Sequence, residues 1–547
     1  MKLNTKQYLL QIIVVGAVVS TLILTPFFNK DAMIIPKLIV MFTLASFFLP
    51  VLYLNRKILF QSTYLKILFS FNLMLLMQSV IVFILSEAPF EQQIFGRTGR
   101  GLGLITILSL SVLTLAIALL FEKDSSKKLL SGLILSGVIS SLYSIGQSFG
   151  FDLLKWDSKT NGVIGTLGNP NFQSAFAAMI IVPAITFWGG NRKKLYLSVL
   201  IPIIFIYTIY RTQSTQGIVA GFFAVTATLV IFLWYKSKKL FIVTTISGCV
   251  AGLLAIAGML NFGPLSDYLY KVSIQSRGDF WRSAFSTANA HPFFGVGLDS
   301  FGDYSLKYRD LTAANHSFAE YTDNAHNFFL EQAATGGYIF AIINSLLIFL
   351  VLFSFYKIQK INKKFDPTIT SLFASWLAFQ STSVISPGSL AIMIWNALIS
   401  GVIIGQAASL SKTSIATSSP NSISFKFGPS VLFAIAGFAI LLPMFNTDRM
   451  QLEGMQNKNA NLVMKATTSY PESTVRYSLI GQELLSSGLY VQALEVARSG
   501  VKFNPNSAGL WALVLVNPSA SLDERINAKN KIIELDPLNK EVKNFTP

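Results

Sequence analysis

Apolar runs, each about 20 residues long, recur along the chain from Tyr8 to Phe445. A helix of about 20 residues crosses the roughly 30 Å hydrocarbon core of a bilayer. Because no water in that core can satisfy backbone N–H and C=O groups, each run is expected to be a helix. The pattern predicts spans near residues 8–28, 32–54, 65–86, 101–121, 128–149, 172–188, 195–211, 215–235, 240–262, 336–356, 368–386, 388–408 and 427–445.

The composition agrees with an integral membrane protein. Of 547 residues, 52% are hydrophobic and 13% are charged, whereas a soluble chain usually carries about 25% charged residues. A net charge of +17 would suggest a nucleic-acid partner in a soluble protein. Here the lysines and arginines lie in short loops between apolar runs, so no nucleic acid is expected as a partner. We predict an all-α fold with about 12–13 transmembrane helices.

The basic residues also predict the orientation of the chain. If the N-terminus is cytoplasmic, 20 basic residues fall on the cytoplasmic side and six in the short outer loops. Cytoplasmic loops are typically the ones rich in Lys and Arg. The long loop from Gly263 to Thr335 is then predicted to face outward, and so is the tail that follows the last span.

Composition divides the chain into a polytopic membrane domain, a linker with an additional span, and a polar tail, at residues 1–410, 411–445 and 446–547. In the tail, proline-containing turns recur at steps of 34 and 32 residues, at Tyr470-Pro471, Asn504-Pro505 and Asp536-Pro537. A period of about 34 residues is typical of tetratricopeptide repeats. We therefore predict a tetratricopeptide-like helical tail that folds apart from the membrane domain and binds a protein partner. A plain helical cap without partners is the alternative.

Side chains suited to proton transfer lie in the predicted outward loop. The sequence has three histidines, and all of them lie there: His291, His316 and His326. Histidine changes charge near neutral pH, but each also has a structural alternative, in a turn, at the surface or at a helix start. Their spacing resembles no zinc pattern, and the single cysteine lies in an apolar run. Neither a metal nor a cofactor is predicted.

Arginines accompany the histidines in this loop. It contains Ser276-Arg277-Gly278-Asp279-Phe280-Trp281-Arg282. A guanidinium forks onto two phosphate oxygens, so Arg277 and Arg282 beside a bilayer suit a lipid pyrophosphate; anchoring at the interface is the alternative. Short outward segments add further candidates, with helix capping as the alternative for the asparagines: Asn169 and Asn171 after Gly165, Arg211 in a hairpin, and Arg97 with Arg100.

These residues resemble a known family. The loop is similar to that of the O-antigen ligase and polymerase superfamily, in motifs that end with His326-Asn327, nine residues and Gly337. The other matching positions are Arg277 with Trp281 four residues later, Pro292, Gly295, Gly297 and Phe301. The Gly165–Asn171 segment also resembles a family motif. Because span number and loop position agree with the family as well, the resemblance covers roughly residues 1–410. Two positions depart from the family: Gln216 stands where an arginine is usual, with Arg211 nearby, and Phe340 replaces a smaller residue.

The resemblance implies a membrane glycosyltransferase with a GT-C-like fold, in a bacterial plasma membrane. Such enzymes transfer a glycan from a polyprenyl-pyrophosphate carrier to a hydroxyl of a lipid, glycan or protein acceptor, without a metal and with inversion. By this resemblance His326 is the general base and Arg277 holds the leaving pyrophosphate. The other substrate-binding candidates are Arg211, Arg282, Asn169, Asn171, Trp281 and Asn327.

Several functions remain open at this point. Ligases, glycan polymerases and protein O-oligosaccharyltransferases of the superfamily share this signature. The histidine–amide pair favours a ligase, whereas the predicted outward tail favours a protein acceptor. A lipid-linked glycan transporter or flippase is the alternative from another class. Transporters tend to have buried polar residues at mid-membrane and paired halves with broken helices, and the sequence shows few charges within its spans.

Overall fold

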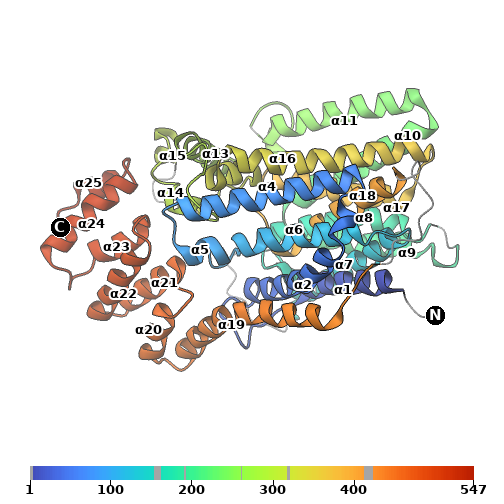
Figure 1. The fold of residues 1–547 in the computed structure, drawn as a ribbon. Coiled ribbons are helices and arrows are strands. Elements are labelled where there is room, and N and C mark those ends of the chain that lie inside the picture. The colour runs from blue at the N-terminus through green and yellow to red at the C-terminus, as the bar shows by residue number, and fades with distance from the viewer. Residues whose placement is uncertain are drawn as a thin grey trace.

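The computed structural model describes residues 4–152, 162–189, 192–259, 261–270, 272–316, 321–411 and 423–547. Within these ranges the regular structure is helical, without strands. The chain forms a bundle of long helices roughly aligned with one another, and the C-terminal tail lies beyond one end of it (Figure 1). The predicted all-α membrane fold is confirmed.

Among the described residues, nine helices are long and apolar enough to cross a membrane. They are α1 (Thr5–Leu22), α2 (Ile34–Leu54), α4 (Thr63–Leu85), α7 (Ser125–Ser148), α10 (Thr215–Lys236), α11 (Lys238–Met259), α16 (Phe328–Asn362), α18 (Leu390–Leu410) and α19 (Phe427–Gln456). Three shorter apolar helices are α6 (Leu104–Leu119), α8 (Pro170–Thr186) and α9 (Leu197–Thr212). With α17 (Pro367–Ser383), every predicted span overlaps one of these helices.

The long helices bury one apolar core. Helix α2 packs between α19 and α6, and α8 packs against α9, α10 and α17. Helix α11 packs mainly on α10 and buries almost none of its surface within the chain, so most of its apolar side chains are left for lipid. The multi-pass character of the protein follows from these helices.

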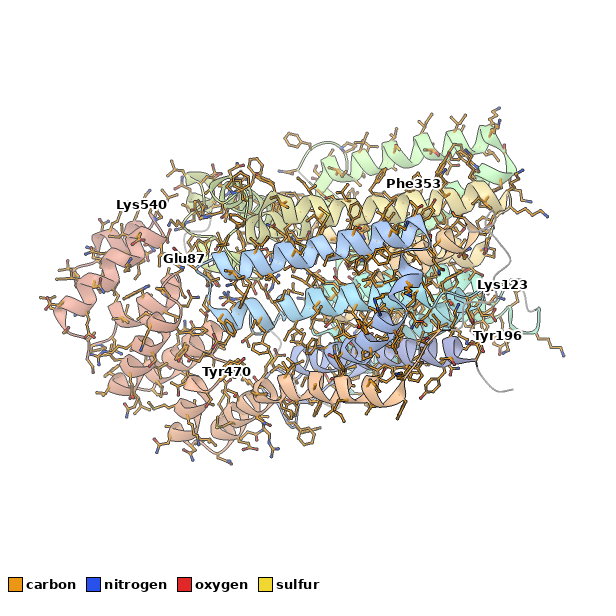
Figure 2. The ribbon with its side chains drawn as sticks, in the orientation of Figure 1. Glu87, Lys123, Tyr196, Phe353, Tyr470 and Lys540 are labelled. Carbon is orange, nitrogen blue, oxygen red and sulfur yellow. The ribbon has the colours of Figure 1, made fainter. Side chains whose placement is uncertain are left out.

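One end of the bundle holds the segments that matter for function, and we call it the loop end. It contains the long helix α13 (Val272–Ala290) and the short helices α5 (Phe90–Phe95), α14 (Phe301–Tyr304) and α15 (Leu311–His316). Another short helix, α12 (Ser266–Leu269), precedes α13 in the chain. The remaining short elements are α3 (Arg56–Leu59), η1 (Gly165–Leu167) and η2 (Arg192–Lys194). Figure 2 shows Glu87 and Tyr470 towards this end, whereas Lys123 and Tyr196 lie at the opposite end.

Helix α16 begins before the predicted span does. The expected start was residue 336, but α16 begins at Phe328, because the Asn327 side chain accepts hydrogen bonds from the N–H groups of Phe329 and Leu330, each at 3.0 Å. The helix then breaks at Gly337, whose φ is 79°. The nine residues between Asn327 and Gly337 are therefore the first turns of this helix.

The glycine-rich stretch that follows α13 packs against the break in α16. The N–H of Tyr338 donates to the carbonyl of Pro292 at 2.8 Å. A Cβ at Gly295 would lie 2.3 Å from the carbonyl carbon of Thr335, and one at Gly337 would lie 2.4 Å from that of Phe293. Glycine is needed on both sides because two backbones touch. The matched glycines thus hold the loop against the bundle.

The tail contains α20 (Ala460–Thr468), α21 (Thr474–Ser486), α22 (Tyr490–Phe503), α23 (Ala508–Leu515), α24 (Leu522–Leu535) and α25 (Lys540–Asn544). Helix α21 pairs with α22, and α23 pairs with α24, around a separate apolar core. Helix α19 runs on to Gln456, past the predicted boundary at 446. The tetratricopeptide assignment and the three-part division stay predictions.

The tail, which is predicted to fold apart from the membrane domain, has its own apolar core but also makes buried polar contacts with the loop end. The Asn504 amide donates to Asp303 at 3.0 Å, and Arg309 pairs with Asp536 at 2.8 Å, with both partners buried. Polar and charged groups that are buried need partners, and here each domain supplies the partners of the other. The tail is therefore docked on the loop end.

Candidate active site

A buried ion cluster joins two loops at the loop end. Arg97 and Arg100 follow α5, and their carboxylate partners follow α13. Arg97 Nη1 lies 3.1 Å from Asp303 Oδ1, and Arg100 Nε lies 3.2 Å from Asp299 Oδ1. The other oxygen of Asp299 accepts the backbone N–H of Arg97 at 2.8 Å. Burial would make these charges costly, but each has a charged partner and most have further hydrogen bonds.

The same cluster reaches the segment that precedes His326. Arg100 approaches Asp323 at 3.7 Å and Glu331 at 3.9 Å, and the Arg97 guanidinium donates to the Tyr321 hydroxyl. Burial alone would raise the pKa of Asp323, but Arg100 and Arg97 hold it below its usual range. Asp323 is therefore ionised at neutral pH, and the backbone around it is fixed.

His326 is held in an unusual backbone conformation. Its φ is 49°, in the left-handed region, and its N–H donates to the Asn324 side chain at 2.8 Å. Its carbonyl accepts from Trp281 Nε1 at 3.4 Å. The imidazole stacks on Phe280, with ring centroids 5.6 Å apart. Conformations of this kind cost about 1–3 kcal/mol and persist where surrounding contacts enforce them, often at functional sites.

The surroundings of His326 keep its ring neutral. Burial lowers the pKa of the imidazole, and the positive charges of Arg277 and Arg100 lower it further, to about 4, although Asp323 opposes them. A neutral imidazole has a free nitrogen that accepts a proton. At neutral pH His326 is therefore a ready proton acceptor beside a carboxylate that stabilises the imidazolium once it forms.

Arg277 differs from the other arginines near it. Arg97, Arg100, Arg282 and Arg309 each pair with a carboxylate. In the part of the chain that the structure describes, no carboxylate lies within ion-pair distance of Arg277, and burial lowers the pKa of its guanidinium. It is half-buried on α13, close enough to His326 to act on its charge. A cation in this state favours an anion that comes from outside.

The other candidate residues of the loop make ion pairs and hydrogen bonds within the protein. Arg282 is exposed and engages Asp310 at 2.6 Å and Asp279 at 2.5 Å. Trp281 donates to the backbone of His326, and the Asn327 side chain caps α16. These contacts position the site. Direct substrate binding by the three residues stays a prediction.

A second group gathers where α8 begins and α9 ends. Asn169 caps α8 by accepting the N–H of Asn171 at 2.8 Å, and Asn171 accepts from the Ser214 hydroxyl at 2.7 Å. Arg211 donates to the carbonyl of Ser148 at 2.8 Å. Gln216 is buried, and its Oε1 has no partner among the described residues. The hypothesis that Arg211 replaces the family arginine missing at position 216 stays a prediction.

The remaining histidines have partners away from His326. His291 Nε2 lies 2.8 Å from the Tyr308 hydroxyl, and His316 Nδ1 lies 3.1 Å from Asp279. The roles of Asp299, Asp303 and Phe280 were not predicted from the sequence. One sequence pattern could have indicated the two aspartates. Arg97 and Arg100 lie in one predicted outward loop, and Asp299 and Asp303, four residues apart, lie in another.

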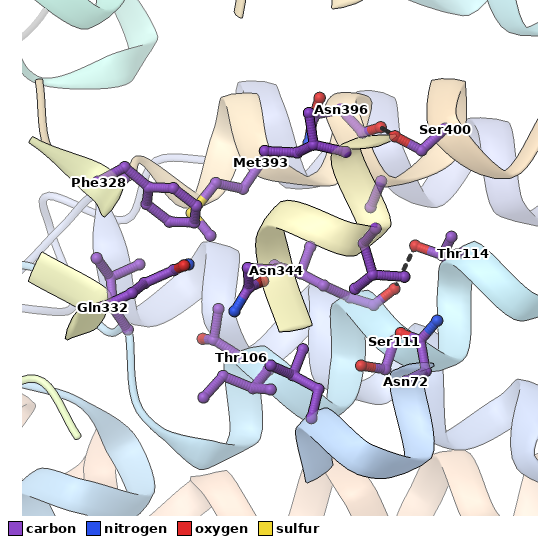
Figure 3. A pocket seen from close by; sticks show the side chains of 18 of the residues that line it. Asn72, Thr106, Ser111, Thr114, Phe328, Gln332, Asn344, Met393, Asn396 and Ser400 are labelled. Carbon is purple, nitrogen blue, oxygen red and sulfur yellow. Dashed lines mark hydrogen bonds between the residues drawn. The ribbon is translucent and has the colours of Figure 1, made fainter. Parts of the chain in front are cut away.

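A cavity of about 180 Å³ lies inside the bundle, below the ion cluster. It is mainly apolar, and amide and hydroxyl groups from five helices surround it, including Asn72, Thr106, Gln332, Asn344 and Asn396 (Figure 3). Asp299 and Glu331 line it as well. The cavity therefore borders the buried ion cluster on one side and the interior of the membrane domain on the other.

Comparison with known proteins gives one match. A search of curated proteins finds no match to the chain. Residues 177–345 match the family model described as O-antigen ligase, a segment that contains Arg277, His326 and Gly337. The resemblance argued from the loop is thus confirmed over that segment. Residues 177–345 are thus similar to an O-antigen ligase domain, which supports the O-antigen ligase superfamily for this chain.

Proposed function

We propose that the protein is a ligase-type membrane glycosyltransferase, which transfers a glycan from a polyprenyl pyrophosphate to an acceptor hydroxyl on the outer side of a bacterial plasma membrane. One observation supports it above others: a half-buried arginine, with no carboxylate partner among the residues that the structure describes, acts on a histidine that is held neutral. The first group suits a departing pyrophosphate, and the second suits a hydroxyl that must lose its proton.

In the proposed reaction, His326 takes the proton of the acceptor hydroxyl as its oxygen attacks the anomeric carbon. The bond from that carbon to the pyrophosphate oxygen breaks, and the polyprenyl pyrophosphate leaves with the electron pair. Arg277 stabilises the added negative charge, and attack opposite the leaving group inverts the anomeric centre. A positioned base contributes about 10²–10⁴-fold to the rate. The scheme uses no metal or cofactor.

Donor binding would also tune the base. Arg277 is the largest charge effect that lowers the pKa of His326. A pyrophosphate bound at Arg277 offsets that charge, so it raises the pKa of the imidazole and makes it a stronger base. The base would then reach full strength when the donor is in place.

The test is a transfer assay with purified protein, lipid-linked glycan and lipid, glycan or protein acceptors, read by product size. His326→Ala should insert and bind donor normally, yet lose transfer by at least about 10²-fold. His291→Ala and His316→Ala are the matched controls and should lose far less. Full activity in His326→Ala would remove the proposed base.

The role of Arg277 is tested in the same assay. Arg277→Ala should abolish transfer, and Arg277→Lys should restore it only in part, because lysine does not fork onto two oxygens. Normal turnover in a stable Arg277→Ala protein would reduce this residue to an interfacial anchor.

The same assay separates the three alternatives within the superfamily. A product on a glycan acceptor indicates a polymerase, one on a lipid acceptor a ligase, and one on a protein acceptor an oligosaccharyltransferase.

The intramembrane cavity is the observation that favours transport instead. Its volume of about 180 Å³ is below the roughly 300–1,000 Å³ of sites for drug-sized ligands, which is small for the head group of a lipid-linked glycan. A flippase would move labelled donor across vesicles and form no new glycosidic bond. Movement without a product would therefore contradict the glycosyltransferase proposal.

A further inference from the structure

A cleft of about 460 Å³ opens between the docked tail and the loop end. His326, Asp323 and Phe280 line it from the membrane domain, together with Arg97, Thr98, Tyr321 and Thr322. Four residues of α21 form the opposite wall: Val475, Ser478, Leu479 and Gln482. Its volume falls within the range of ligand-binding pockets, about 300–1,000 Å³.

The tail wall has the properties of a built surface. Its four residues follow the spacing of one helix face. Leu479 is 51% exposed, an apolar side chain that faces the cleft and not the tail's own core. The start of α21 is fixed, since Ser473 lies 2.7 Å from the Thr98 hydroxyl and Thr474 lies 3.2 Å from Gln92. The face of α21 is therefore held at a set distance from His326.

The cleft lies on the acceptor side of the proposed reaction. Its described lining includes His326 but not Arg277, so it reaches the base and not the site of the leaving group. Its one arginine and one aspartate balance in charge, and His326 is neutral. Aromatic rings on one wall and an amide and a hydroxyl on the other suit the apolar faces and hydroxyl edges of a sugar.

We propose that α21 forms one wall of the acceptor site, and that the cleft binds the sugar end of a saccharide acceptor. This inference rests on the proposed glycosyltransferase function. It makes the tail a part of the site that selects the acceptor. Leu479 and Gln482 are the specificity-determining residues, and the bond-making groups stay in the membrane domain.

The test uses the full-length protein with lipid-linked glycan and two acceptor probes: a glycolipid that carries an oligosaccharide, and a serine-containing peptide. Leu479→Trp fills the cleft. Glu483→Trp is the matched control, because Glu483 is exposed on the same helix but does not line the cleft. Donor binding and thermal unfolding are measured for each protein.

Leu479→Trp should lower kcat/KM for the glycolipid by at least about 10-fold, mainly through KM, and leave donor binding and unfolding unchanged. Gln482→Ala should raise the same KM. Equal kinetics in Leu479→Trp, Glu483→Trp and wild type would overturn the cleft assignment while wild-type transfer upholds the proposed function. Transfer only to the peptide would overturn the saccharide class. Transfer to neither probe, with donor left intact by the wild type, would overturn both proposals.

Discussion

The positive charge of Arg277 helps to keep His326 neutral, so Arg277→Gln should raise the pKa of the His326 imidazole. An ordinary histidine has a pKa of about 6.5, and that of His326 is about 4. The folded site thus disfavours the imidazolium by roughly 3 kcal/mol. Burial is the larger cause and survives the substitution. The pKa in Arg277→Gln should therefore rise above about 4 and stay below about 6.5.

The three histidines make this measurable by NMR titration of protein with labelled histidine side chains. His326→Gln assigns the signal of interest, and His291 is the internal control, because burial and Lys307 lower its pKa and Arg277 is not among the causes. Adding inorganic pyrophosphate should raise the pKa of His326 in the wild type. In Arg277→Gln the same addition should have little effect.

The sign of the effect on activity follows from the same values. At pH 5, a group with a pKa of about 4 is about nine-tenths neutral, whereas an ordinary histidine is almost wholly protonated. The kcat/KM of the wild type, which reports the pKa values of the free enzyme, should therefore persist at pH 5. The opposite result would be an equal pKa of His326 in the wild type and in Arg277→Gln, both with and without pyrophosphate. That result would refute the electrostatic link between the base and the leaving-group site.

Three further predictions concern orientation, backbone contact and tail docking. In a cysteine-free background, a membrane-impermeant thiol reagent should label Lys540→Cys but not Lys123→Cys in intact cells; the reverse would invert the predicted topology. Gly337→Ala should lower the free energy of unfolding by at least about 1–3 kcal/mol, because its positive φ and the Phe293 backbone leave no room for a Cβ, whereas Gly428→Ala, in open space, should not. Arg309→Met leaves a buried carboxylate unpaired at a cost of about 3–5 kcal/mol, so hydrogen exchange in the tail should accelerate; unchanged exchange would mean that docking does not depend on this pair.

The long spans were predictable because each is a continuous apolar run of sufficient length. The start of α16 was not, because its first turns include Glu331 and Gln332, which read as loop residues. Both are buried against the ion cluster and the cavity. Hydropathy alone does not identify the part of a membrane helix whose polar residues are paired through tertiary contacts.

Electrostatics at the loop end were misjudged for a related reason. Arg97 and Arg100 are two of the six basic residues that the predicted orientation places in the short outer loops. In the structure they are buried and paired with Asp299 and Asp303. Charges on the wrong side of a predicted topology were thus a sign of tertiary pairing. Counting the acidic residues in the facing loop would have indicated their partners.

The regular spacing of the turns in the tail already indicated which edge of the tail docks on the membrane domain, although docking was not predicted. A stack of helical hairpins brings equivalent turns to one edge. Ser473, Asn504 and Asp536 lie in or beside the three repeated turns, and their partners in the membrane domain are Thr98, Asp303 and Arg309. Asn and Asp are common in turns because their side chains hydrogen-bond to the nearby backbone. Their presence in these turns therefore did not indicate a contact with another domain. Because all three turns engage the same end of the bundle, the repeat defines a docking edge, and α21 is the helix that this edge brings against the cleft above His326.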